Sequence, residues 1–253
     1  MTLGDWEKKA YRQFNKAKKV FDKILWASMA AALIILAGCN SSDKSETKLS
    51  VEENLQLVQE SNEDIFGWIY VPGTDINGPL LQNKDGEDDY YLYHNYMDEF
   101  DINGAVFIES ANLPTMTDFN EVIYGKPNES TGFDDLYQFE DEEFFDQHDS
   151  MYIYINGNAL TYVIFMAYER ENTNILEQYD LTYASGCQQF INDMNTAKSM
   201  NKNVRDGWEN MIETDNFIVT LTAVSEGDKQ LVVMGCLVGD AAGTIDRWFD
   251  VEE

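Results

Sequence analysis

Three cysteines and two histidines are the residues of this chain best suited to nucleophilic or metal chemistry. A cysteine beside a histidine can act as a nucleophile, and clusters of the two can hold zinc. The sequence contains no C-x-x-C pair and no H-E-x-x-H segment, so we expect neither a metal site nor a cofactor. We interpret His94, in a tyrosine-rich stretch, as a structural residue and His148, after an acidic run, as a surface residue near a helix end.

Cys39 follows a segment that is typical of export signals. Residues 1–38 contain seven basic and three acidic residues, and residues 24–38 form an apolar run of 15 residues. A membrane-spanning helix needs about 20 apolar residues, whereas the apolar part of a signal peptide is shorter. The sequence Leu36-Ala37-Gly38-Cys39 matches the lipobox of bacterial lipoproteins, in which the cysteine thiol takes the lipid. We therefore expect lipidation of Cys39, with an uncleaved membrane anchor as the alternative.

These features predict three parts of the chain. Residues 1–38 are expected to be the signal peptide or membrane anchor, residues 39–50 a polar tether, and residues 51–253 one folded domain. Both alternatives for the first part leave the domain on the extracellular face of the membrane. A disulfide between Cys187 and Cys236 is possible in that setting, but we favour two buried thiols.

The charge of the chain excludes one large class of functions. Its 253 residues include 17 basic and 46 acidic side chains, a net charge of −29, and residues 39–253 carry −33. A nucleic-acid partner needs a basic surface, so none is expected. We interpret the acidic cluster of Asp85, Glu87, Asp88 and Asp89 as a solvated loop, because its spacing does not match a calcium-binding EF-hand. Residues 140–143 are expected to form the exposed first turn of a helix.

Short apolar runs separated by turn residues dominate residues 51–253. Alternating apolar positions predict strands at 67–71, 78–82, 105–108, 121–124, 151–155, 161–168, 216–224 and 230–238. Asn156-Gly157-Asn158 is a favourable hairpin turn between two of them. Helices are predicted at 51–61 and 182–200 from their helical spacing of apolar residues. Many short strands with few helices indicate a mainly β fold, a closed antiparallel barrel with helices attached.

Several segments, in order along the folded part, resemble class B sortases. Each motif is short, but together they run from about residue 51 to 238. The segments are residues 62–76, Pro79-Leu80-Leu81-Gln82, residues 90–96, Gly104-Ala105-Val106-Phe107-Ile108, Val122-Ile123-Tyr124-Gly125 with Phe133-Asp134-Asp135-Leu136, and Thr220-Leu221-Thr222-Ala223-Val224.

This resemblance implies a sortase-type barrel of about eight strands, with N-terminal helices and an inserted helix. Sortases are cysteine transpeptidases of Gram-positive cell surfaces, which cut a sorting signal and join it to a cell-wall or pilin amine. Their reaction needs a thiolate nucleophile, a histidine that handles the leaving-group proton, and an arginine that holds the oxyanion or the substrate carbonyl.

This chain departs from the family at all three catalytic positions. Lys126 follows Tyr124-Gly125 where the family has histidine, Val224 follows Thr220-Leu221-Thr222-Ala223 where it has cysteine, and Gln230 stands where it has arginine. Valine has no nucleophile and glutamine has no charge. We therefore expect a catalytically inactive surface lipoprotein that retains a binding cleft. The expected cleft residues are Tyr124, Lys126, Thr222, Val224, Ser225 and Gln230, and the expected partners are a sorting-signal peptide, a pilin or a true sortase.

Two alternatives stay open. In the first, Lys126 and Ser225 form a Ser–Lys dyad in a divergent transpeptidase or hydrolase, which requires a neutral lysine in a strongly acidic chain. In the second, the cleft has closed and the protein is purely structural. An open groove would favour binding, whereas a groove filled by large side chains would favour the structural role. Cys236 is expected to lie in the core, about 20 Å along its strand from the cleft, and to have no chemical role.

Overall fold

The computed structural model describes residues 55–56, 58–155 and 157–243. The expected signal or anchor segment, the tether and Cys39 lie outside these residues. All of the described residues belong to one compact unit, Leu49–Glu253. Among the described residues, no helix is both long and apolar enough to cross a bilayer.

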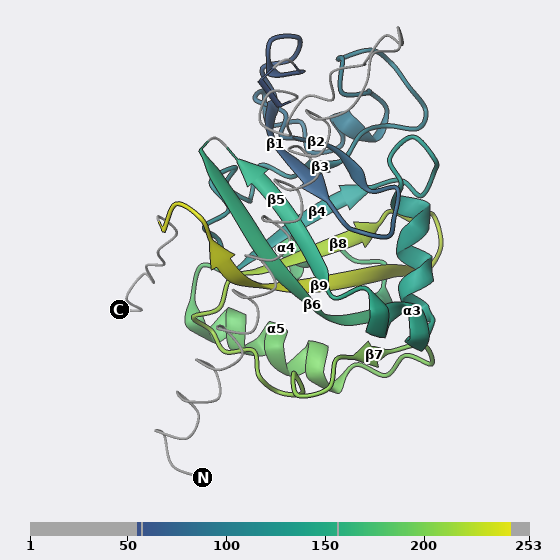
Figure 1. Cartoon of the computed structure of the whole chain (residues 1–253), viewed down its shortest axis with the longest axis vertical. Coiled ribbons are helices and arrows are strands. Elements are labelled where there is room, and N and C mark those ends of the chain that lie inside the picture. Colours follow the sequence, from purple (N-terminus) through teal and green to yellow (C-terminus); the bar gives the residue numbers. More distant parts are fainter. Residues whose placement is uncertain (1–54, 57, 156, 244–253) are drawn as a thin grey trace, which may run out of the picture. The chain divides into compact units, whose positions relative to one another are not determined.

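A closed barrel of eight strands forms the centre of this unit (Figure 1). The strands follow one another around the barrel in the order β5-β1-β2-β3-β4-β8-β9-β6, and β6 pairs with β5 to close it. A short ninth strand, β7 (Asn203–Val204), pairs with the outer part of β6. The barrel strands are β1 (Ile65–Tyr70), β2 (Asn77–Leu81), β3 (Phe107–Ile108), β4 (Asn120–Gly125), β5 (Ser150–Ile155), β6 (Asn158–Glu171), β8 (Ile218–Ala223) and β9 (Lys229–Asp240).

The closed, mainly β architecture is confirmed, but the expectation that it is antiparallel throughout is wrong. Strand β4 pairs in parallel with β8, from Asn120 opposite Ile218 to Gly125 opposite Ala223, and β2 pairs in parallel with β3. Parallel neighbours need a long crossover connection, and more than ninety residues separate β4 from β8. The sequence pattern identifies the strands but does not specify which distant strands pair.

Two apolar clusters share the residues of β4, β8 and β9. Alternate residues such as Ile123, Leu221 and Val233 join residues of β1, β5 and β6 in a cluster inside the barrel. The residues between them, such as Val122 and Val232, pack instead against the helix α5 (Ala184–Thr196). Because the strands are covered on both faces, every residue of β4 and β8 is buried.

The helices follow their local sequence signals. Residues 55, 56, 58 and 59 are helical, and α5 buries Phe190, Ile191 and Met194, as the apolar spacing predicts. Helix α3 (Glu142–Gln147) begins at the expected acidic run, where the Asp141 side chain accepts a hydrogen bond from the backbone N–H of Phe144. The remaining helical segments are η1 (Tyr90–Leu92), η2 (Phe133–Glu140) and α4 (Ile175–Gln178).

The reactive side chains singled out in the sequence are used for packing. Cys187 and Cys236 are buried and form no disulfide with each other, and burial raises the pKa of the Cys236 thiol to about 12. His94 stacks on Tyr90 with ring centroids 3.9 Å apart. His148 is the C-cap of α3, as expected from the sequence, but it is half-buried rather than a surface residue, because it stacks on Phe144.

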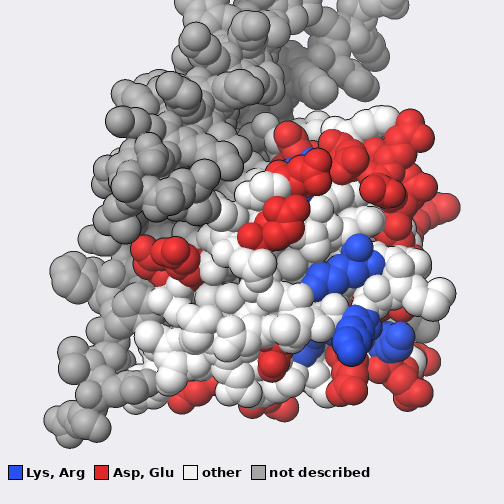
Figure 2. Space-filling model, turned by 90° about the horizontal axis from the view of Figure 1, so that it is seen from below, with Lys and Arg blue, Asp and Glu red and all other residues white. Residues whose placement is uncertain are grey.

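Acidic side chains mark much of the surface. In Figure 2, Asp and Glu lie both at the edge and within the face shown, and most of the visible Lys and Arg lie near one another on one side of it. Across the described residues there are two ion pairs, Lys84–Glu63 and Lys229–Glu169, and both are largely exposed. Most acidic side chains of the described residues therefore form no ion pair with a neighbouring cation.

Candidate functional site

The ends of β4, β8 and β9 meet at one place on the barrel. The β8–β9 register runs from Ile218 opposite Cys236 to Thr222 opposite Val232, so Val224, just beyond β8, and Gln230, near the start of β9, lie at the same end of this strand pair. The backbone N–H of Val224 donates to the carbonyl of Gly125 at the end of β4, with an N···O distance of 2.9 Å. Residues from three strands are thereby held at the mouth of the same pocket.

This open pocket, the strand-end pocket, has a volume of about 360 Å³. Tyr124, Val224 and Gln230 line it together. Its other apolar residues include Leu92, Phe107 and Leu176, and its polar wall is formed by Asp88, Asp89, Glu109, Asn172, Thr173, Asn174 and Glu177. Large side chains border this space without closing it.

The side chain of Gln230 is held in the wall of the pocket by a hydrogen bond. Its side chain is only 6% exposed, and its Nε2 donates to the carbonyl of Thr173 over 3.0 Å. The same carbonyl accepts from Nη1 of Arg170, which lies opposite Gln230 in the β6–β9 register. Gln230 therefore ties the end of β9 to the segment that leads into α4.

A carboxylate and an amide connect two other walls. Nδ2 of Asn174 donates to both carboxylate oxygens of Glu109, each at 2.9 Å, while Oδ1 of Asn174 caps α4 by accepting from the N–H of Leu176. Burial raises the pKa of Glu109, the hydrogen bond from Asn174 opposes this shift, and Asp88 and Glu177 add to it. Burial also raises the pKa of Tyr124, so its hydroxyl stays protonated and can donate.

Three of the six expected cleft residues do not line the strand-end pocket. Nζ of Lys126 donates to the carbonyl of Ile102 and lies 3.9 Å from the centroid of the Tyr93 ring. Oγ of Ser225 accepts from the N–H of Gly227 within its own turn. Thr222 is fully buried, and its Oγ1 has no hydrogen-bond partner among the described residues.

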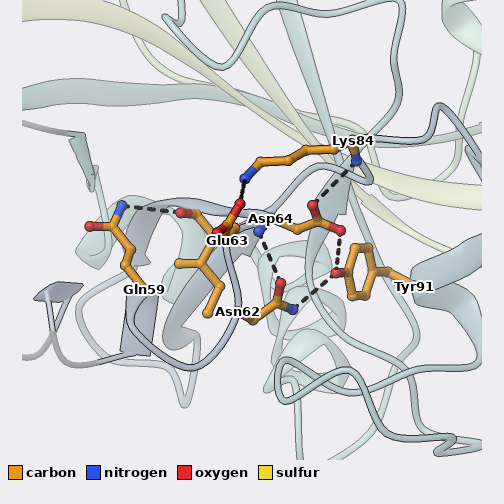
Figure 3. Close-up of polar contacts among 7 residues, drawn as sticks. Gln59, Asn62, Glu63, Asp64, Lys84 and Tyr91 are labelled. Carbon is orange, nitrogen blue, oxygen red and sulfur yellow. Dashed lines mark hydrogen bonds and ion pairs between the residues drawn. The ribbon is translucent and has the colours of Figure 1, made fainter.

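A polar network outside the pocket supports the segment that carries its acidic wall (Figure 3). Tyr91, in η1, donates from its hydroxyl to Asp64 over 2.8 Å and accepts from Nδ2 of Asn62 over 3.0 Å. Asp64 also accepts from the backbone N–H of Lys84. Because η1 follows directly after Asp88 and Asp89, these contacts hold the acidic wall against the start of β1.

No family model matches this chain. Two characterised relatives do match over 193 residues. Sortase B of Listeria monocytogenes is 28% identical to it, covering 74% of this chain and 75% of the relative. Sortase B of Staphylococcus aureus is 25% identical over a similar share of both chains, 74% and 76%.

Solved structures agree with this match. A mutant form of Clostridium perfringens sortase B superposes with a TM-score of 0.64 and 26% identity, covering 74% of this chain and 87% of that one. In sequence and in fold, this chain is similar to class B sortases. A structure of the Staphylococcus aureus sortase B–substrate complex has the same fold at a TM-score of 0.62, with 21% identity, and covers 93% of this chain and 98% of that one.

Sequence reasoning on the sortase-like chain missed Glu109 and Asn174, which connect two walls of the pocket. For both residues, the neighbouring sequence indicates a position at the end of a strand or the start of a helix. Glu109 follows directly after the predicted strand 105–108, and Asn174 precedes Ile175-Leu176-Glu177, a suitable N-cap before a helical turn. Their hydrogen bonds join residues 65 positions apart, and no local pattern indicates that pairing.

Proposed function

We propose that this sortase-like protein binds a peptide or protein partner in the strand-end pocket and does not catalyse transpeptidation. The observation that carries the proposal is the joint position of Val224 and Gln230, which line one open pocket together with Tyr124. In the motif comparison these two residues stand where the family has its cysteine and its arginine.

The chemistry of the pocket supports binding over catalysis. Val224 offers apolar surface but cannot form a thioester, and the Gln230 amide is already bonded to Thr173. Among the described residues that line the pocket there is no cysteine, histidine, lysine or arginine. Such a wall can hold an extended chain but has no nucleophile–base pair to attack it.

The alternative functions have less support. The Lys126 side chain is hydrogen-bonded to Ile102 and the Ser225 side chain to Gly227. Among the described residues, no hydrogen bond joins Lys126 to Ser225. A purely structural role would need a filled cleft, whereas the strand-end pocket has a volume of about 360 Å³. The substrate complex of the related Staphylococcus aureus enzyme shares this fold, which is further support for a binding role.

Peptide titration tests the binding role. We expect sorting-signal peptides to shift NMR resonances of residues 124, 224 and 230, with micromolar or weaker affinity, about −8 kcal/mol or less favourable. Val224→Arg fills the pocket and should abolish the shifts. Val204→Arg, at a partly buried valine of β7, is the matched control and should leave them unchanged. Shifts that persist in Val224→Arg would contradict the proposal.

A cleavage assay tests the absence of catalysis. We expect no turnover of a sorting-signal peptide by the wild-type protein, because no thiolate is available at the pocket. If cleavage is observed and is lost in Ser225→Ala, the Ser–Lys alternative is correct. If it is lost instead in Val224→Ala, the proposed inactivity is wrong.

The proposed location is the outer face of the cytoplasmic membrane in a Gram-positive cell envelope, with Cys39 carrying the lipid. The motif Leu36-Ala37-Gly38-Cys39 supports this location, and it lies outside the described residues. Palmitate labelling of the wild-type chain and of Cys39→Ala should give label in the first alone. Equal labelling of both would leave the uncleaved membrane anchor as the better account.

A further inference from the structure

The charged residues that line the strand-end pocket are all acidic. Four of its lining residues are acidic, Asp88, Asp89, Glu109 and Glu177, and its described lining residues include no basic side chain. Such a concentration of like charge costs free energy unless a counter-charge is present, and low-dielectric walls strengthen its field. The pocket therefore favours a cationic occupant over a neutral or anionic one.

A second pocket continues the first. It has a volume of about 380 Å³ and shares three lining residues with the strand-end pocket, Ala111, Leu176 and Glu177. It adds the carboxylates of Asp118 and Asp180, again without a basic residue among the described lining. The two pockets are adjacent, because Ala111, Leu176 and Glu177 lie in the walls of both, and together they are called the groove.

Asn120 gives the second pocket an unused hydrogen-bond donor. This side chain is fully buried in the pocket wall, and its Oδ1 accepts from Oγ1 of Thr220 over 2.8 Å. Its Nδ2 has no hydrogen-bond partner among the described residues. A buried donor without a partner is destabilising, so a carbonyl oxygen of a ligand would be a favourable partner.

Two cations, Arg170 and Lys126, neighbour the groove, and the charge of Arg170 partly opposes the burial that raises the pKa of Tyr124 in its wall. Arg170 donates to the carbonyl of Thr173 and to Oε1 of Gln178, and Lys126 donates to the carbonyl of Ile102. Neither side chain lines the groove. Burial raises the pKa of Glu109, and the nearby charges of Asp88 and Glu177 raise it further, which agrees with a negative field at its carboxylate.

We propose that this groove binds an extended peptide segment that carries lysine or arginine side chains. The aliphatic stem of such a side chain packs on Tyr124 and Val224, while its cationic head meets Glu109 or Glu177. A backbone carbonyl of the segment accepts from Asn120. This inference rests on the proposed binding function and adds the charge of the partner.

Matched peptides test the charge preference. We use acetylated, amidated hexapeptides that alternate leucine with lysine, glutamine or glutamate, and measure their binding to the full-length chain in detergent by fluorescence anisotropy. The lysine peptide should bind at least about tenfold more tightly than the glutamate peptide, with glutamine between them. Its affinity should fall as salt rises, because salt screens partly exposed charge pairs.

Variants locate the effect in the groove. Asp88→Asn together with Glu177→Gln removes two exposed carboxylates and should weaken the lysine peptide about tenfold, with little effect on the glutamine peptide. Glu143→Gln together with Asp146→Asn removes two exposed carboxylates of α3, outside the groove, and should change neither. An equal loss in both double variants would overturn the assignment of the charge effect to the groove.

The same set of measurements separates this inference from the proposed function. If all three peptides bind equally and Val224→Arg blocks them all, the groove binds peptides without a charge preference and only the present inference fails. If none binds, or if Val224→Arg blocks none, both the inference and the binding function fail.

Discussion

Glu121 is a carboxyl group enclosed in the barrel wall. It lies on β4, is 1% exposed, and accepts from the N–H of Asp118 through Oε1. Its Oε2 has no hydrogen-bond partner among the described residues. Burial raises the pKa of Glu121 well above the usual 4.5, and the charge of Asp118 raises it further. The folded state therefore favours the protonated carboxyl group.

The substitution Glu121→Gln tests whether this buried carboxyl group affects the stability of the protein. A raised folded-state pKa means that the contribution of Glu121 to the free energy of unfolding is fully present below pH 4.5 and is lost as pH rises through the folded-state pKa. The amide cannot ionise and can donate to Asp118, so we expect Glu121→Gln to be more stable by about 1–3 kcal/mol at neutral pH. Urea unfolding at several pH values measures this difference.

Exposed Glu143 supplies the control, because Glu143→Gln should leave the pH dependence of stability nearly unchanged. If Glu121→Gln kept the wild-type slope, the carboxyl group would not be the source of that slope.

Arg205 shows how one side chain joins separate elements. It follows β7, and its guanidinium donates to the carbonyl of Ile164 in β6 and to the carbonyl of Phe145 in α3, both at 2.6 Å. A longer bond of 3.3 Å reaches the carbonyl of His148, the C-cap of α3. The carbonyls at a helix C-terminus have no partner within the helix, so these contacts stabilise the end of α3 against the barrel.

Arg205→Lys should destabilise the protein although it keeps the charge. Lysine lacks the planar fork that lets one side chain reach several carbonyls at fixed angles. We expect a loss of about 1.5–3 kcal/mol in the free energy of unfolding. Chemical denaturation measures it, and hydrogen exchange should show faster exchange in α3 and at Ile164.

The exposed ion pair Lys84–Glu63 provides the control, because its loss shows how much a cation on the surface contributes to stability. Lys84→Ala should cost at most about 1 kcal/mol. If Arg205→Lys cost no more than Lys84→Ala, the fork contacts would not stabilise the joint between α3 and β6.

Charge repulsion acts on the whole molecule. Residues 39–253 carry a net charge of −33. The described residues offset it with two exposed ion pairs. Self-repulsion of this kind keeps a protein soluble but destabilises its compact state.

We expect the melting temperature to rise with salt. Screening is strong once the Debye length falls from about 30 Å at 0.01 M to about 3 Å at 1 M salt, so repulsion between distant carboxylates should then vanish. Calorimetry over this range at constant pH is the measurement. Uncharged sucrose is the control for non-electrostatic stabilisation. A melting temperature that stays constant or falls with salt would contradict a dominant role of repulsion.

Sequence alone determined the features that depend on neighbouring residues. Alternating apolar residues identified β1 and the β5–β6 hairpin, acidic residues after Asp141 identified the start of α3, and the order of short motifs identified the sortase-type barrel. The same motifs singled out Tyr124, Val224 and Gln230 as cleft residues. These signals are local because strand alternation, helix capping and turn geometry each act over a few residues.

Only the tertiary structure decided which of these residues meet. The parallel pairing of β4 with β8 brings Val224 to the end of β4, and the antiparallel pairing of β8 with β9 brings Gln230 into the lining of the same pocket. The same packing directs Lys126 to Tyr93, away from the pocket, and joins Glu109 to Asn174 across 65 residues of chain. The acidic groove results from this packing, because the position of a charge in space depends on which elements bury their apolar faces against one another.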